Sequence, residues 1–101
     1  MKKIKNIHPG EILQEEFLKE YNITAYKLAK DTNIPPTRIS QIIKGKRSIS
    51  ADTALRFSKY FGTTPDFWMG LQIEYDLREE SNIKAKEIKA IKSLYEIQHT
   101  L

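Results

Sequence analysis

The 101-residue sequence contains no cysteine, so a disulfide framework and thiolate chemistry are both excluded. No apolar run approaches the roughly 20 residues that a membrane span needs. The lysines of "MKKIKNIH" are not followed by an apolar core of signal-peptide length. With 40% hydrophobic and 30% charged residues, the chain has the composition of one globular domain. We therefore expect a cytoplasmic protein with no membrane partner.

Candidates for metal binding or catalysis are also few. His8 and His99 stand near opposite ends of the chain, with no metal-ligand spacing around them, and "HPGE" is better interpreted as a helix start. Glu15, Glu16 and Glu20 are expected on a solvated helix side, with no nucleophile beside them. An acidic patch for a basic partner protein is the alternative for these three residues. We predict no enzyme activity, no metal and no cofactor.

Strict strand alternation is absent, and helical periodicity dominates. Helix-start and helix-stop signals punctuate the chain: Pro9, the predicted caps at Thr24, Ser50 and Thr64, and glycines at 45 and 62. The fold class predicted from these signals is all-α, with five helices and a C-terminal helical extension. The five helices are expected near residues 9–21, 25–32, 35–44, 51–61 and 65–80.

Apolar spacing suggests which side chains form the core. Leu13, Phe17 and Tyr21 recur at every fourth residue of the first helix, and Phe67 and Trp68 are expected to close the core from the fifth. In residues 81–101, apolar side chains again recur every three or four positions among lysines. This amphipathic helix could pack on its own domain, on a second subunit or on a partner protein.

One stretch of the chain lacks acidic residues entirely. No acid occurs from Thr32 to Ala51, although the chain has 13 acids and a net charge of +4. On a helical wheel over residues 35–44, three isoleucines form an apolar back, at 39, 42 and 43. The opposite face carries Thr37, Gln41 and Lys44, with Arg38 and Ser40 on its flanks. An ordinary surface helix that lacks acids by chance is the alternative interpretation.

Such a front fits the major groove of DNA, where base edges present donors and acceptors between two rows of phosphates. We predict that Thr37, Arg38 and Gln41 read bases. The residues expected at the DNA backbone are Ser40, Lys44, Lys46 and Arg47, together with Tyr26 and Lys27 near the start of the preceding helix. Two short helices joined by the tight break "NIPP" form a helix-turn-helix arrangement. Residues 1–80 are accordingly predicted to be a DNA-binding domain.

The stretch "AYKLAKDTNIPPTRISQIIKGKRSISADTALRFSKYFGTTPDFWMGLQ" resembles the Cro/CI-type (XRE) helix-turn-helix domains of phage and bacterial repressors, whose fold is lambda-repressor-like. The flanking "HPGEILQEEFL" and "TTPDFWMGLQIEYDL" are closer to the HigA-type antitoxins, a VapI-like subgroup. This resemblance implies a homodimer that represses its own operon at palindromic half-sites. It also implies a toxin partner, an mRNA-cleaving ribonuclease of the HigB/RelE-like class.

The resemblance also bears on individual residues. Thr37, Arg38 and Gln41 fall where the family's recognition helix reads bases, and the basic residues at 44, 46 and 47 fall on its backbone-contacting turn. Pro36 departs from many family members, which place a polar base-contacting residue there. The alternative function is a phage-type repressor with no toxin. "MKKIKN" is expected to fray at its end or, alternatively, to touch DNA.

Overall fold

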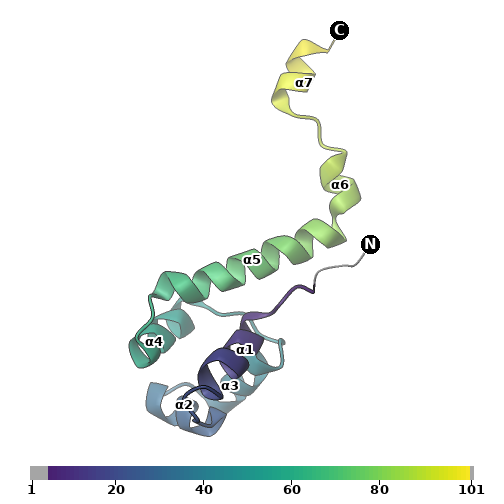
Figure 1. Cartoon of the computed structure of the whole chain (residues 1–101). Helices are drawn as coiled ribbons and strands as arrows, with labels where there is room; N and C mark the ends of the chain where they lie inside the picture. Colours follow the sequence, from purple (N-terminus) through teal and green to yellow (C-terminus); the bar gives the residue numbers. More distant parts are fainter. Residues whose placement is uncertain (1–4, 101) are drawn as a thin grey trace.

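The computed structural model describes residues 5–100, and every regular element in that range is helical (Figure 1). The elements are α1 (Pro9–Ile12), η1 (Leu13–Leu18), α2 (Ala25–Thr32), α3 (Pro36–Ile43), α4 (Ala51–Phe61), α5 (Pro65–Ile83), α6 (Ala85–Lys89) and α7 (Leu94–His99). The all-α fold class is thereby confirmed. No helix in this range is both long and apolar enough to cross a bilayer.

The predicted caps account for where the helices begin. The hydroxyls of Thr24, Ser50 and Thr64 each accept a hydrogen bond from the backbone N–H three residues later, at 3.0, 3.3 and 3.1 Å. Each hydroxyl satisfies one of the N–H groups that a helix start leaves without a partner. Gly62 ends α4 in the left-handed conformation, with φ of 77°.

The first helix differs from the prediction. A regular helix was expected over residues 9–21, but residues 13–18 form a π-helical segment, in which the Lys19 N–H donates to the Gln14 carbonyl at 3.1 Å. This wider turn contains an extra residue, so Leu18 is the next fully buried side chain after Leu13, and Phe17 packs partly buried against the core. Tyr21 lies beyond the last turn and is 57% exposed.

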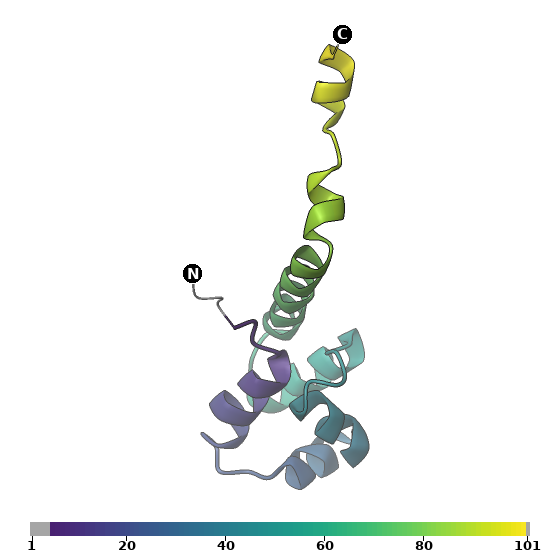
Figure 2. The same ribbon diagram turned by 90° about the vertical axis from the view of Figure 1, so that its right-hand side faces the viewer.

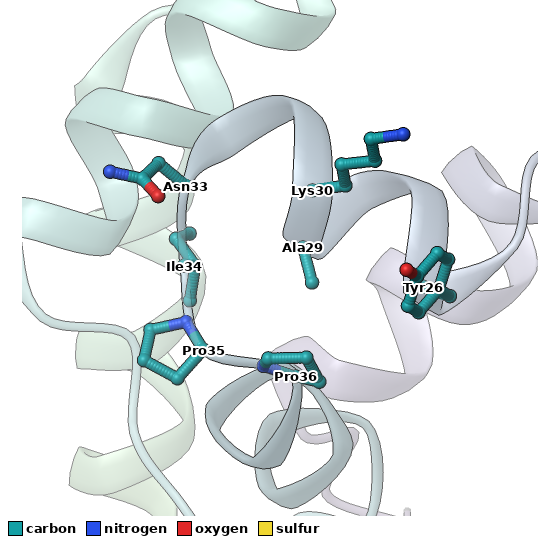
Figure 3. Close-up of a pocket in the computed structure, with 7 residues that line it drawn as sticks. All are labelled: Tyr26, Ala29, Lys30, Asn33, Ile34, Pro35 and Pro36. Atoms are coloured by element: carbon teal, nitrogen blue, oxygen red, sulfur yellow. The ribbon is translucent and has the colours of Figure 1, made fainter.

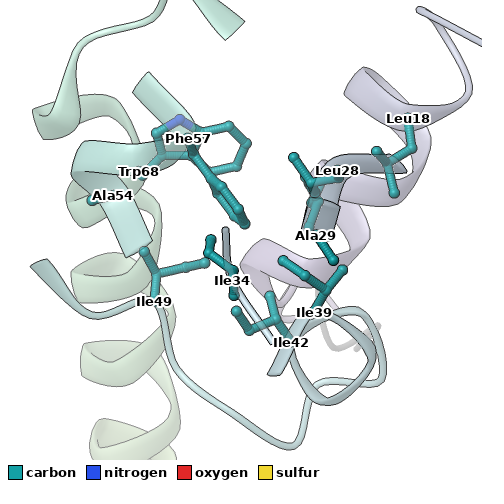
Figure 4. Packing of buried hydrophobic residues seen from close by; sticks show 11 residues of the cluster. Leu18, Leu28, Ala29, Ile34, Ile39, Ile42, Ile49, Ala54, Phe57 and Trp68 are labelled. Atoms are coloured by element: carbon teal, nitrogen blue, oxygen red, sulfur yellow. The ribbon is translucent and has the colours of Figure 1, made fainter. Parts of the chain in front are cut away.

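The core lies between the two layers formed by α1–α3 and α4–α5 (Figure 4). Its fully buried aromatic residues are Phe57 and Trp68, whose rings meet edge to face at 5.1 Å. The Trp68 indole N–H donates to the Thr63 hydroxyl at 2.8 Å, which satisfies the one polar atom of a buried side chain. Phe67 is 39% exposed and packs edge to face against Trp68. Of the two aromatic residues predicted to close the core, Trp68 is therefore fully buried and Phe67 only partly.

The periodicity predicted one amphipathic helix for the C-terminal extension, and the structure differs from that prediction. α5 continues to Ile83, and α6 and α7 follow as separate short helices, with every residue from 84 to 100 exposed. Both views show this segment leading away from the bundle, and the molecule measures 63 × 30 × 21 Å (Figures 1 and 2). Short helices without a packing face are stabilised only by their own hydrogen bonds, so the segment breaks at Lys84 and again before Ser93, which caps α7.

The N-terminal segment is tied to the bundle from Lys5 onward. Lys5 pairs with Glu11 of α1 at 2.8 Å. The Asn6 amide donates to the Tyr75 carbonyl at 2.9 Å and to the Glu79 carboxylate at 3.1 Å, both on α5. The first four residues of "MKKIKN" lie outside the described residues, so the predicted arm is tested only at its last two positions, which are held by α1 and α5.

Candidate nucleic-acid interface

The two helices of the predicted motif are joined by a turn of three residues. Asn33 takes the left-handed conformation, with φ of 58°, and the Ile34 N–H donates to the Ala29 carbonyl at 3.0 Å. Ile34 is buried and anchors the turn to the core. Because a residue before proline is driven to extended backbone, Pro35 stays outside the helix and α3 begins at Pro36, one residue later than predicted.

The two faces of α3 match the predicted wheel. Ile39 and Ile42 are fully buried, and Ile43 is half-buried against the core. Thr37 and Gln41, one helical turn apart, are both exposed on the opposite side. The structure therefore brings two of the three predicted base readers together on one open face, with the helix held by its isoleucines.

A close approach to α1 sets the position of α3. A Cβ atom on Gly10 would lie 1.8 Å from the Ile42 carbonyl oxygen, so only glycine allows this contact. At this same C-terminal end α3 closes on Gly45, which has φ of 75° and donates its N–H to the Ile42 carbonyl at 3.0 Å. The Lys46 N–H donates to the Gln41 carbonyl at 2.8 Å, which fixes the basic loop relative to the helix.

His8 connects α1, α5 and the end of α3. Its Nδ1 accepts a hydrogen bond from the Gly10 N–H at 2.9 Å, so the ring caps α1. The ring meets Tyr75 edge to face at 4.8 Å and lies beside Gly45. Burial lowers the pKa of His8 below its ordinary value, while the charges of Asp76 and Glu11 oppose that shift. A neutral imidazole is what the cap requires, since a protonated Nδ1 cannot accept.

Arg38 is placed differently from the other two predicted readers. It lies on the side of α3 that faces α4, where its Nη1 donates to Asp52 Oδ2 at 3.1 Å, and its side chain is only 29% exposed. Arg56 holds the same carboxylate through Nε, at 3.1 and 3.2 Å. Hydrogen bonding from Arg56 lowers the pKa of Asp52, and Arg38 adds to the effect.

The sequence analysis missed this ion-pair network. The spacing of Asp52 and Arg56, four residues apart in α4, is visible in the sequence as a helical pair. The pairing of Asp52 with Arg38 is not, because 14 residues separate them and only the tertiary fold brings the start of α4 beside Arg38 of α3.

The start of α2 was predicted to contact the DNA backbone. Tyr26 is 70% exposed on its first turn. Lys27 is exposed but pairs with Asp31 at 2.8 Å, and the hydrogen bond that it donates to the Asp31 carboxylate raises the pKa of Lys27. A pocket of about 370 Å³ lies between this helix and the start of α3. Figure 3 shows its lining residues, with Tyr26 and Lys30 at one side and the exposed Pro36 at the other.

The remaining predicted residues lie on or directly after α3. Ser40 is half-buried on the helix, and Lys44 is exposed at its end. Lys46 and Arg47 are exposed in the following loop, so the basic residues flank the open face without a neighbouring acid on α3 itself. Among residues 5–100, no group of three or more histidine or acidic side chains is arranged to hold a metal ion.

A comparison with known families gives this arrangement its context. The model of the helix-turn-helix family matches residues 15–68, which include α2, α3 and α4. Antitoxin HigA-1 of Vibrio cholerae is 32% identical over 97 residues, or 94% of this chain and 91% of that protein. The chain belongs to the HigA group of this family. Virulence-associated protein I of Dichelobacter nodosus is 49% identical over 72 residues, or 71% of this HigA-type chain and 67% of that relative.

A solved relative extends the likeness to three dimensions. The structure of Pseudomonas aeruginosa antitoxin HigA with the higBA promoter superposes on this HigA-type chain with a TM-score of 0.86 at 41% sequence identity. The match covers 89% of this chain and 99% of that one. It confirms the predicted fold and the predicted resemblance to HigA-type antitoxins.

Proposed function

We propose that this chain is the antitoxin of a toxin–antitoxin pair and represses its own operon by binding DNA. The observation that carries the proposal is the open face of α3, which exposes Thr37 and Gln41 and has basic residues at its end and no acid. The Pseudomonas aeruginosa relative, whose structure was solved with the higBA promoter, supports promoter DNA as the ligand. A regulator of this kind acts at the bacterial chromosome, so we place it in the cytoplasm and assign it no catalytic activity.

Within that role, Thr37, Arg38 and Gln41 are the proposed base readers. Gln41 is exposed, and its amide can donate to the N7 acceptor of adenine and accept from the adenine amino group. Gln41→Ala should weaken binding to the DNA upstream of the chain's own operon by roughly 1–3 kcal/mol and leave binding to random DNA nearly unchanged. A gel shift with both duplexes decides the point, and equal loss on the two would remove Gln41 from base reading.

The proposed backbone contacts come from Lys44, Lys46 and Arg47, and from Ser40, Tyr26 and Lys27 at the edges. Lys46→Ala should weaken binding to operator and random DNA alike and lower the salt slope of binding by about one. Lys86→Ala is the matched control, because α6 lies far along the extension from α3 (Figure 1). A slope that stays the same in Lys46→Ala, or falls equally in both variants, would refute the phosphate contact.

We also propose that the chain binds DNA as a homodimer on half-sites about one helical turn apart, roughly 34 Å. Ile73 and Leu77 support this, since both are more than half exposed, at 54% and 65%, and stand four residues apart on α5. A second copy would cover this apolar surface. Leu77→Lys should shift the mass measured by light scattering toward the monomer and weaken operator binding. An unchanged dimer would place the contact elsewhere.

The toxin partner is the remaining part of the proposal. The name of the Vibrio relative, an antitoxin, supports a toxin as the protein that this chain neutralises. The resemblance to HigA-type antitoxins implies that this toxin is a HigB/RelE-like mRNA-cleaving ribonuclease. Co-expression with the product of the neighbouring gene should yield a stable complex and restore growth to cells that the toxin alone arrests. A neighbouring product that neither co-purifies nor arrests growth would leave only the repressor role.

A further inference from the structure

The network around Asp52 assigns this residue a role in reading DNA. Arg38 lies at the edge of the open face of α3, and its guanidinium gives one hydrogen bond to Asp52. A guanidinium has five N–H donors in a fixed plane. Among residues 5–100 this is its one hydrogen bond, so the edge that carries Nη2 is left available to an outside acceptor.

Asp52 is itself held from two directions. It is the second residue of α4, where the positive end of a helix favours a carboxylate. Arg56 grips both of its oxygens, and Arg56 Nη1 also donates to the Thr32 carbonyl at the end of α2, at 2.9 Å. The carboxylate is therefore fixed relative to both helices of the motif before any DNA arrives.

We propose that Asp52 is a positioning residue that holds Arg38 for bidentate recognition of guanine. An arginine free in solution must be ordered when it binds, and a partner that already fixes its rotamer reduces this entropy cost. Guanine O6 and N7 are the acceptor pair that matches the remaining guanidinium edge. This inference rests on the proposed DNA-binding function and on Arg38 as a reader within it.

The same carboxylate, which we propose favours recognition of guanine, also lowers the overall affinity for DNA. A negative charge beside α3 repels phosphates, so it weakens binding to every sequence. Removing it should therefore tighten binding to random DNA while it relaxes the choice of base at one position. A residue with a purely structural role would not produce these two changes together.

The test uses the full chain and a set of operator duplexes in which each base pair of a half-site is replaced in turn. The proteins are wild type, Arg38→Ala, Asp52→Asn, Asp52→Ser and the Arg38→Ala/Asp52→Asn double variant. Asp66→Asn is the matched control, because Asp66 is likewise an exposed acid at the second position of a helix, α5, and lies outside this network. Thermal melts by circular dichroism show that each variant is folded at the assay temperature.

In wild type, replacing the G·C pair read by Arg38 should weaken binding by about 5- to 150-fold. Arg38→Ala should remove that penalty. Both Asp52 variants should reduce it by about threefold or more, keep the penalties at the other pairs, and cause no further change when Arg38 is already alanine. Asp66→Asn should behave as wild type.

Four results would overturn the inference, and they are distinguishable from one another. A G·C penalty that depends on Arg38 but survives in both Asp52 variants refutes the positioning role alone. An equal loss at every pair in the Asp52 variants shows a structural role instead. If the wild-type protein discriminates between bases but no base-pair penalty disappears in Arg38→Ala, then Arg38 is refuted as a base reader. No preference for the operator at all refutes the proposed function, and the inference with it.

Discussion

The contact between α1 and α3 can be tested by giving Gly10 a side chain. The Cβ of alanine would lie 1.8 Å from the Ile42 carbonyl oxygen, whereas real Cβ contacts are essentially never shorter than 3.0 Å. The two helices must therefore separate by about 3.0 − 1.8 = 1.2 Å. No rotamer change can relieve the clash, because the atoms on the α3 side belong to the backbone of Ile42 and Ile43.

Two energy terms decide the outcome for Gly10→Ala. Alanine in place of glycine favours a helix by roughly 0.5–1 kcal/mol. Forcing apart two packed helices typically costs about 1–3 kcal/mol, and here the displacement exceeds an ångström. We expect a net destabilisation of about 1–2 kcal/mol, which lowers the melting temperature of a domain this size by roughly 4–16 °C.

Gly70→Ala is the matched control for this change. Gly70 also lies inside a helix, α5, but an added Cβ there would meet no atom within 4 Å. Only the helix-propensity gain remains, so this variant should melt above wild type by a few degrees. Thermal melts and urea titrations of the two variants measure the expected loss of stability in Gly10→Ala and the expected gain in Gly70→Ala.

The displacement of α3 should also weaken DNA binding, because Ile42 lies on the helix that carries the proposed base readers. Operator affinity of Gly10→Ala should fall at a temperature where the variant is still folded, while Gly70→Ala binds as wild type. A Gly10→Ala protein as stable as wild type, or more stable, would refute the close approach of the two helices and the account of how α3 is positioned.

Further predictions concern the buried polar groups. Burial lowers the pKa of His8 below its ordinary value of 6.5, so below that pH the unfolded chain binds more protons than the folded chain. The contribution of His8 to stability is therefore full above about pH 6.5 and falls as the pH drops toward the folded pKa, by at most about 1.4 kcal/mol per pH unit. Urea titrations at several pH values should show this slope, and His8→Asn, which can still cap α1, should flatten it. The side-chain Oε1 of the buried Gln72 accepts a hydrogen bond from the Ile49 backbone N–H at 2.8 Å. Gln72→Leu should therefore lower the free energy of unfolding by about 1–3 kcal/mol and speed hydrogen exchange at the Ile49 amide. A Gln72→Leu protein with unchanged stability and exchange would contradict that role.

The local features of the chain were the most predictable from the sequence. Hydroxyl residues at Thr24, Ser50 and Thr64 predicted helix starts because capping depends on residues only three positions apart. The two faces of α3 were predictable for a similar reason, since helical geometry alone sets which of its side chains share a side. The π-helical segment was not, because residues 13–18 contain no signal that separates it from an ordinary helix.

Residue types and helical periodicity suffice to predict that this chain is all-helical, that α3 has an apolar back of isoleucines, and that its front carries no acid. The passage of Gly10 beside Ile42 and the hold of Asp52 on Arg38 of another helix could be seen only in the folded chain. Both are contacts between residues far apart in the chain, which depend on how the helices pack and leave no periodic pattern in the sequence.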